Sequence, residues 1–213
     1  MEKIINSFSE YIAIELKLDE DKKKVIAYGT FVLMQTIISI LLLILFGIIF
    51  KCTMEALIIS FTVSILRKYS GGVHASSSGR CALLGTMICI GGALLIIHLL
   101  YPVIDIRLLI ITELIAFIYS YFTTVKLVPV DNPKKPIKSI KKKEKMKKIS
   151  LTIVTIYLII ISLCIFLWVY TGKNIFVIYS LCIELGLLWQ VFTLTSMGHL
   201  LVFKLDKLLK NLI

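Results

Sequence analysis

A thiol and an imidazole that could act as a nucleophile and its base lie seven positions apart in the chain. Cys81 and His74 belong to a polar segment, from Arg67 to Cys81, that interrupts an otherwise apolar first half. A cysteine beside a histidine that removes its proton is a common catalytic nucleophile. On one straight helix, however, the two residues would be about 10 Å apart along the axis, which is too far for proton transfer. We therefore expect a bend between them.

The residues between the pair favour such a bend. Gly71 and Gly72 precede the histidine, and a Ser-Ser-Ser-Gly run follows it. These residues favour turns and helix caps over helix interiors. The apolar run that starts at Ala82 predicts a helix capped by Ser77 or Ser78. The cysteine would then lie in the first turn of this helix.

Several positive groups near that turn would favour a thiolate and a developing oxyanion. Helix N-termini carry free N–H groups and the positive end of the dipole, and Arg67, Lys68 and Arg80 add charge. Backbone N–H groups from Gly79 to Cys81, or the Arg67 or Arg80 side chains, are candidate donors to an oxyanion. From spacing alone, an ordinary basic cytoplasmic loop is the simpler interpretation.

The same segment resembles the signature of a known family. The matching residues are Arg67, the string Gly71-Gly72-x-His74-Ala75, and Cys81. They are similar to the signature of the AgrB (accessory gene regulator B) family, integral-membrane cysteine endopeptidases of bacterial quorum sensing. The segment from Pro129 to Ile137 resembles the proline- and asparagine-containing segment that the family carries before its basic loop. Val73 stands where many relatives have an aromatic residue.

The resemblance implies a substrate, a mechanism and a set of site residues. His74 would take the proton of Cys81, and the thiolate would cleave a small AgrD-like precursor peptide through an acyl-enzyme thioester. The peptide would have an amphipathic leader, an acidic tail, and an internal cysteine or serine that closes a thiolactone or lactone ring. A homodimer is compatible with the family, and neither a cofactor nor a metal ion is expected. Candidate oxyanion or substrate-binding residues are Arg67, Arg80, Gly71, Gly72 and Ser78, and candidate substrate contacts are Asp131, Asn132, Lys134, Lys135 and Glu184.

Composition predicts a polytopic membrane protein. Hydrophobic residues make up 58% of the 213 positions and the mean hydropathy is +0.94, values that soluble domains do not reach. The first two dozen residues are polar and lack the apolar core of a secretory signal. Five cysteines without framework spacing predict no disulfides, and three scattered histidines predict no metal site.

The apolar runs predict one all-α membrane domain over residues 1–213. The second run is only about 13 residues long, so its helix either continues through Arg67 to Ser70 or is partly re-entrant. Amphipathic patterns at 1–26 and 196–213 predict interfacial helices at the two ends. Six spans are expected between these two helices: 28–50, 54–66, 82–100, 108–125, 150–170 and 175–194. The first four spans lie within 28–125.

A lysine-rich segment, 126–149, is predicted to be a basic cytoplasmic loop. Ten lysines against Asp131 and Glu144 give it +8 of the formal net charge of +11. By the positive-inside rule, both termini and the segment from Arg67 to Cys81 would lie on the cytoplasmic side of a bacterial cell membrane. The lysines could meet anionic lipid or the acidic part of a peptide. Nucleic-acid binding is not expected, because the lysines lack interleaved aromatic residues and a recognisable module.

Ionisable residues inside the predicted spans leave other functions open. Glu113, Glu184 and His98 are costly in a membrane and are therefore candidate functional groups. Glu184 could orient an imidazole, line a substrate cavity or pair within the bundle. A small transporter or peptide exporter could use the two glutamates along a path, although internal repeats are lacking. A noncatalytic membrane sensor or scaffold is a third alternative. Transport should survive replacement of Cys81, whereas peptide cleavage should stop.

Overall fold

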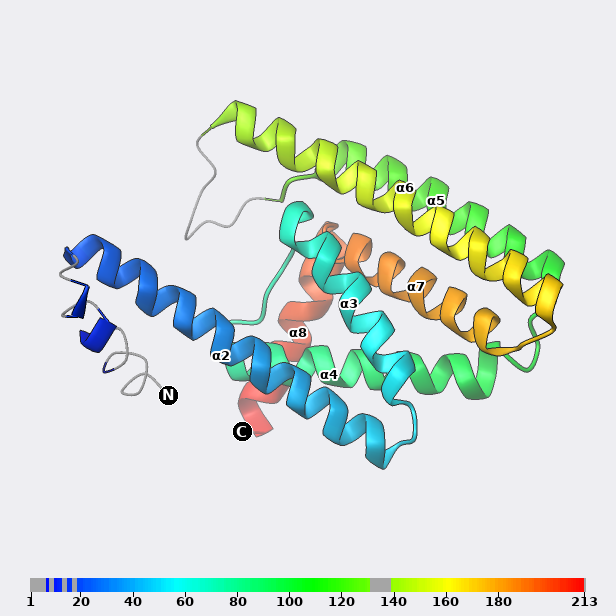
Figure 1. Cartoon of the computed structure of the whole chain (residues 1–213), viewed down its shortest axis with the longest axis horizontal. Coiled ribbons are helices and arrows are strands. Elements are labelled where there is room, and N and C mark those ends of the chain that lie inside the picture. Colours follow the sequence, from blue (N-terminus) through cyan, green and yellow to red (C-terminus); the bar gives the residue numbers. More distant parts are fainter. Residues whose placement is uncertain (1–6, 8–9, 13–14, 17–18, 131–138, 213) are drawn as a thin grey trace. The chain divides into compact units, whose positions relative to one another are not determined.

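The structure is a computed structural model that describes residues 7, 10–12, 15–16, 19–130 and 139–212. All regular elements in this part of the chain are helices, which confirms the all-α fold (Figure 1). The described residues contain no strand, and one isolated bridge pairs Gly71 with Val130. In chain order the helices are α2 (Glu20–Ile49), α3 (Thr53–Ser70), α4 (Ser78–Leu95), the π-helix η1 (Ile96–Leu100), α5 (Ile106–Leu127), α6 (Ile140–Thr171), α7 (Ile175–Phe192) and α8 (Ser196–Leu212).

The chain forms two compact units, Met1–Leu42 and Leu43–Ile213. In the first unit, α2 begins at Glu20, because the Asp19 carboxylate accepts a hydrogen bond from the Lys22 N–H at 2.8 Å and caps the helix. The predicted N-terminal helix over 1–26 is therefore wrong at its end, since residues 20–26 belong to α2.

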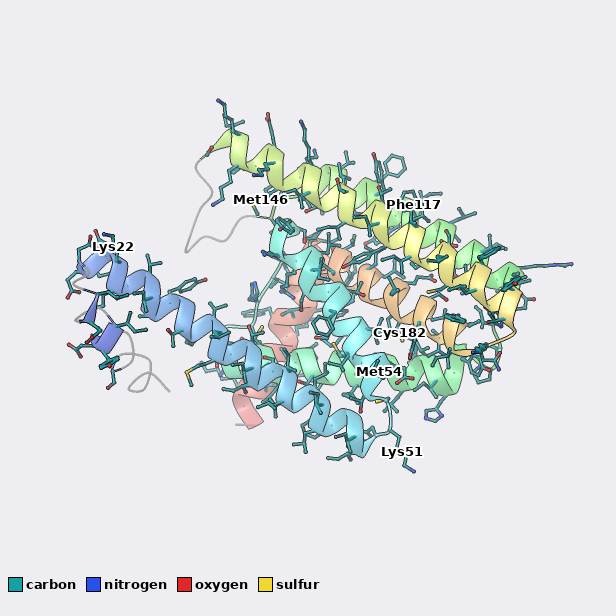
Figure 2. The ribbon with its side chains drawn as sticks, viewed as in Figure 1. Lys22, Lys51, Met54, Phe117, Met146 and Cys182 are labelled. Atoms are coloured by element: carbon teal, nitrogen blue, oxygen red, sulfur yellow. The ribbon has the colours of Figure 1, made fainter. Side chains whose placement is uncertain are left out.

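Helix α7 forms the centre of the second unit. It packs against α3, α4, α5 and α6, and in Figure 1 it lies between α3 and the α5–α6 pair. A helix that is apolar on all sides is stable only when it is surrounded, and α7 buries Val177, Cys182 and Leu187 almost completely. Cys182 is labelled in Figure 2 within this core. A hydrogen bond of 2.9 Å from the Tyr157 hydroxyl to the Thr62 carbonyl joins α6 to α3.

Among the described residues, five helices are long and apolar enough to cross a membrane: α2, α4 with η1, α5, α6 and α7. The protein is therefore a multi-pass membrane protein. Outward-facing apolar residues on these helices, such as Ile115, Phe122 and Phe166, are exposed, as expected for surfaces that face lipid. Helix α3 continues through Arg67 to Ser70, one of the two predicted arrangements, and its 18 residues extend about 27 Å.

The lysine-rich segment is not a loop over its whole length. Helix α6 begins at Ile140, ten residues before the predicted span, and the Ser139 side chain accepts a hydrogen bond from the Lys142 N–H at 3.4 Å. Lysine is a good helix former when its charge stays in water, so this part of the segment is helical. The prediction of a loop up to residue 149 is therefore wrong from Ile140 onwards.

The buried glutamates hydrogen-bond within the bundle. The Ser162 hydroxyl donates to Glu113 at 2.8 Å, and the Thr112 hydroxyl lies 3.4 Å from Glu184. Both glutamate residues are 6% exposed. Of the three predicted roles for Glu184, these contacts favour pairing within the bundle.

Candidate active site

The cysteine and histidine that are seven positions apart in the sequence lie close together in the structure. The Sγ atom of Cys81 is 3.8 Å from Nδ1 of His74. Cys81 is partly buried and His74 is exposed. Helix α3 ends at Ser70 and α4 begins at Ser78, so the predicted bend is present and its nonhelical part is 71–77, narrower than 67–81.

The first turn of α4 positions the thiol. Ser77 is the N-cap residue, without a capping bond from its side chain, and its carbonyl accepts from the Cys81 N–H at 2.9 Å. The cysteine therefore lies in the first turn, as predicted, but its N–H is used by the helix. The prediction that this N–H is a free oxyanion donor is wrong. The N–H groups of Gly79 and Arg80 come before the first N–H that bonds within the helix, so they have no acceptor in the helix itself.

Two glycines start the bend because other residues would not fit there. Gly71 has φ +75° and ψ −150°, and Gly72 has φ +130°; the conformation of Gly71 belongs to a region that essentially only glycine occupies. A Cβ on Gly71 would collide with the carbonyl oxygen of Val130, and one on Gly72 would lie 2.8 Å from Thr193 Oγ1. The Val130 N–H donates to the Ser70 carbonyl at 2.9 Å. Thus the segment after α5 packs directly against the start of the loop.

The C-terminal end of α7 holds the other side of the loop start. The Gln190 side chain is fully buried, and its Nε2 donates to Ser70 Oγ at 2.9 Å and to the Gly71 carbonyl at 2.8 Å. The Thr193 carbonyl accepts from the Val73 N–H at 3.3 Å. Sequence reasoning missed Gln190 and Thr193; their only signal was polarity at the end of an apolar run.

Arg67 places a cation beside the pair. Its Nη2 donates to the Val73 carbonyl, while its Nε is buried and has no hydrogen-bond partner among the described residues. Burial, followed by the positive charge of Arg67, lowers the pKa of His74 to about 4. Although the residue is exposed as a whole, the surrounding protein removes enough water to favour the neutral ring. His74 is therefore neutral at pH 7 and can accept a proton.

Arg80 has partners on the last helix. Its Nε lies 2.7 Å from Asp206 Oδ1 in α8, and its Nη2 donates to Ser76 Oγ at 2.6 Å. The Ser76 hydroxyl, followed by Arg80, lowers the pKa of Asp206 to about 2, so this carboxylate is ionised at physiological pH. Sequence reasoning missed Asp206, whose only signal was an acidic residue in an amphipathic tail.

The other predicted site residues are less informative. Ser78 opens α4 next to the loop. Glu184 lies six residues before Gln190 in α7, about 9 Å along the helix from the loop contacts. Four predicted substrate contacts, Asp131, Asn132, Lys134 and Lys135, lie outside the described residues.

Replacing Gly71 with alanine should destabilise the protein and displace the loop. The strained backbone alone costs about 1–3 kcal/mol, and the new Cβ displaces either the loop or the segment at Val130. We expect a clearly lower midpoint in thermal unfolding of the detergent-solubilised protein. Gly172→Ala is the matched control, because Gly172 also has positive φ, +68°, but has open space around it. The account is contradicted if Gly71→Ala behaves like this control.

Comparisons with known proteins agree with the geometry. The family model described as Accessory gene regulator B matches residues 2–194. Two AgrB-like proteins of Clostridium perfringens, from strain SM101 (type A) and strain 13 (type A), are 40% and 41% identical over all 213 residues, which is the full length of each relative. No solved structure matches the chain significantly. The chain therefore belongs to the AgrB family, whose membership implies a role in the processing of accessory gene regulator quorum-sensing peptides.

Proposed function

We propose that the protein is a membrane-embedded cysteine endopeptidase that cleaves a small precursor peptide. The observation that carries the proposal is the 3.8 Å separation between Cys81 Sγ and His74 Nδ1, in a chain of a peptide-processing family. A thiol within reach of a neutral imidazole is the arrangement that nucleophilic catalysis needs. Contacts of this kind are often loose without substrate and tighten in the complex.

The first chemical step makes a thioester. With its own proton on Nε2, the neutral His74 ring takes the Cys81 proton at Nδ1, and the thiolate forms a C–S bond to the peptide carbonyl carbon. When the tetrahedral intermediate collapses, the C–N bond breaks and His74 returns the proton to the departing amine. The acidic tail leaves with a free amino terminus, and the leader part stays attached to Cys81.

Candidate donors for the oxyanion lie in α3 and at the start of α4. The buried Arg67 Nε–H has no protein acceptor among the described residues, so a substrate oxyanion can use it without breaking another bond. The Gly79 and Arg80 N–H groups at the start of α4 are further donors. The Arg80 side chain is engaged by Asp206 and Ser76.

The second step closes a ring. An internal thiol or hydroxyl of the bound peptide gives its proton to His74 and attacks the thioester carbonyl. The C–S bond to Cys81 breaks, which regenerates the thiolate and releases a thiolactone or lactone. Exchange between thioesters is nearly balanced, so the ring forms efficiently only if water is kept from the acyl-enzyme. A loop packed against α7 and the segment at Val130 supports such exclusion.

The lysines of α6 are a suitable surface for the peptide tail. The hydrogen bond between Tyr157 and Thr62 places α6 beside α3. The two helices are antiparallel, so eight residues from this contact toward the loop are Ile149 in α6 and Ser70 in α3. Residues 141–148 therefore extend beyond the end of α3 where the loop begins, and most of them are exposed. We propose that this end faces the cytoplasm of a bacterial cell and contacts anionic lipid. A homodimer fits the proposal as well.

Purified protein in liposomes tests the proposed function. A synthetic precursor with an amphipathic leader, an internal cysteine and an acidic tail is added, and products are identified by mass spectrometry. We expect the free tail and a leader-containing product that has lost the mass of the tail. Uptake of intact peptide without cleavage would instead support the exporter and contradict the proposal.

A further inference from the structure

Helix α8 reaches the loop through one carboxylate. Asp206 is 7% exposed, and its Oδ2 accepts from the Ser76 N–H at 3.1 Å and from the Ser76 hydroxyl at 2.6 Å. Its Oδ1 lies 2.7 Å from Arg80 Nε. The carboxylate therefore holds two points of the chain that are four residues apart, one in the loop and one in the first turn of α4.

These two points lie between the two members of the reactive pair. Ser76 comes two residues after His74, and Arg80 comes directly before Cys81. Fixing Ser76 relative to Arg80 therefore limits how far the imidazole can move from the thiol. The bonds are charge-assisted, which makes them about twice as strong as bonds between neutral groups.

The inward position of Asp206 is unusual for an amphipathic tail. Its basic neighbours Lys204, Lys207 and Lys210 are exposed, as expected for a helix with a polar outer face. A carboxylate is rarely almost fully buried unless it is paired. The ion pair and the two bonds from Ser76 supply that pairing.

We propose that Asp206 is a positioning residue, which holds Ser76 and Arg80 so that His74 stays within reach of Cys81. Helix α8 thereby completes the active site, although it lies beyond residues 2–194, the part that the family model matches. This inference rests on the proposed function for its kinetic consequences. Its structural part, the coupling of α8 to the environment of Cys81, can be measured without a substrate.

Loss of the Asp206 contacts should slow catalysis through the position of the reactive pair. Asp206→Asn weakens the ion pair with Arg80 and the bonds from Ser76, so these two residues are held less firmly. Displacement of reacting groups by about 1 Å can cost about 100-fold, because it slows proton transfer and attack.

The kinetic test compares Asp206→Asn, Asp206→Glu and the wild type in liposomes. We expect Asp206→Asn to lower kcat for tail release by about 10- to 100-fold with little change in KM. Asp206→Glu keeps the charge and both acceptor oxygens and should recover much of the loss. Lys207→Gln is the matched control, since it changes one charge at the adjacent, exposed position of α8 and should stay within about twofold of wild type.

The substrate-free test measures alkylation of Cys81 by iodoacetamide, followed by peptide mapping. We expect the alkylation rate at one fixed pH to differ from that of the wild type by more than twofold in Asp206→Asn, because the surroundings of the thiol are rearranged, and to stay within twofold in Lys207→Gln. If the wild type does not cleave any precursor, the proposed function fails while this measurement still decides the coupling. If Asp206→Asn does not fold, as judged by circular dichroism and gel filtration, Ser76→Ala takes its place. That variant should also lower kcat, with KM little changed.

Two results would overturn the inference. One is a kcat for folded Asp206→Asn, or for Ser76→Ala in its place, within twofold of wild type. The other is full additivity of Ser76→Ala and Asp206→Asn in the double variant. If Asp206 acts through Ser76, the double variant should instead be hardly slower than Asp206→Asn alone.

Discussion

Replacing Cys81 with alanine is expected to abolish release of the peptide tail. Without the thiol no acyl-enzyme can form, and the remaining oxyanion donors and binding contacts give only weak catalysis. We expect the rate to fall by at least about 1,000-fold. Cys81→Ser should be nearly as inactive, because a hydroxyl is a much weaker nucleophile than a thiol beside the same imidazole. Tail release from a synthetic precursor in liposomes, followed by mass spectrometry, measures both variants.

Another cysteine provides the control for this loss. Cys164 is partly buried in α6, and Cys164→Ala removes a thiol without touching the loop. It should keep most of the wild-type rate. Substantial tail release by folded Cys81→Ala would show that another group is the nucleophile.

His74→Gln should cause the second severe loss of activity, because it removes the base that activates the thiol and the acid that protonates the leaving amine. General acid–base catalysis contributes about 100- to 10,000-fold, and we expect a decrease of that order in kcat/KM. Glutamine keeps a polar side chain of similar length, so the fold should be retained.

The wild-type pH profile provides a further test of His74. Its active form is the neutral ring, and burial together with Arg67 lowers its pKa to about 4. Activity governed by His74 is therefore present above that pH and is lost as the pH falls through about 4, rather than through the ordinary 6.5. The acid limb of kcat/KM against pH reports this value for the free enzyme.

His98 provides the matched control for His74. It is exposed in η1, one turn before the link to α5, and His98→Gln should change neither the rate nor the acid limb. An acid limb near pH 6.5 in the wild type would contradict the partly desolvated environment of His74 beside Arg67. Retention of activity in His74→Gln would contradict its role as the base.

Local patterns in the sequence were sufficient to predict the bend and the helix that hold the candidate pair. The glycine and serine residues predicted the bend, and the apolar run after Cys81 predicted the helix that carries this cysteine. These are short-range properties, since turn preference and helix periodicity depend on neighbours within a few residues. For the same reason the apolar runs predicted an all-α membrane fold. The predicted boundaries were wrong at the start of α6 and at the end of the N-terminal helix.

The contacts that hold the loop could not be predicted in this way. Gln190 is 119 positions from Gly71, and Asp206 is 130 positions from Ser76. No local pattern distinguishes them from other polar residues near the ends of apolar helices. Their role depends on α7 and α8 reaching the same end of the second unit as the loop, which only the tertiary packing reveals.

The most direct test of the account is to trap the acyl-enzyme. The wild type in liposomes is incubated with a precursor whose ring-forming residue is replaced by alanine, so that no internal nucleophile can release the thioester. After an acid quench, peptide mapping should find the leader fragment attached to Cys81, and neutral hydroxylamine should remove it. Tail release with no adduct on Cys81, or with the adduct on another residue, would contradict the central claim.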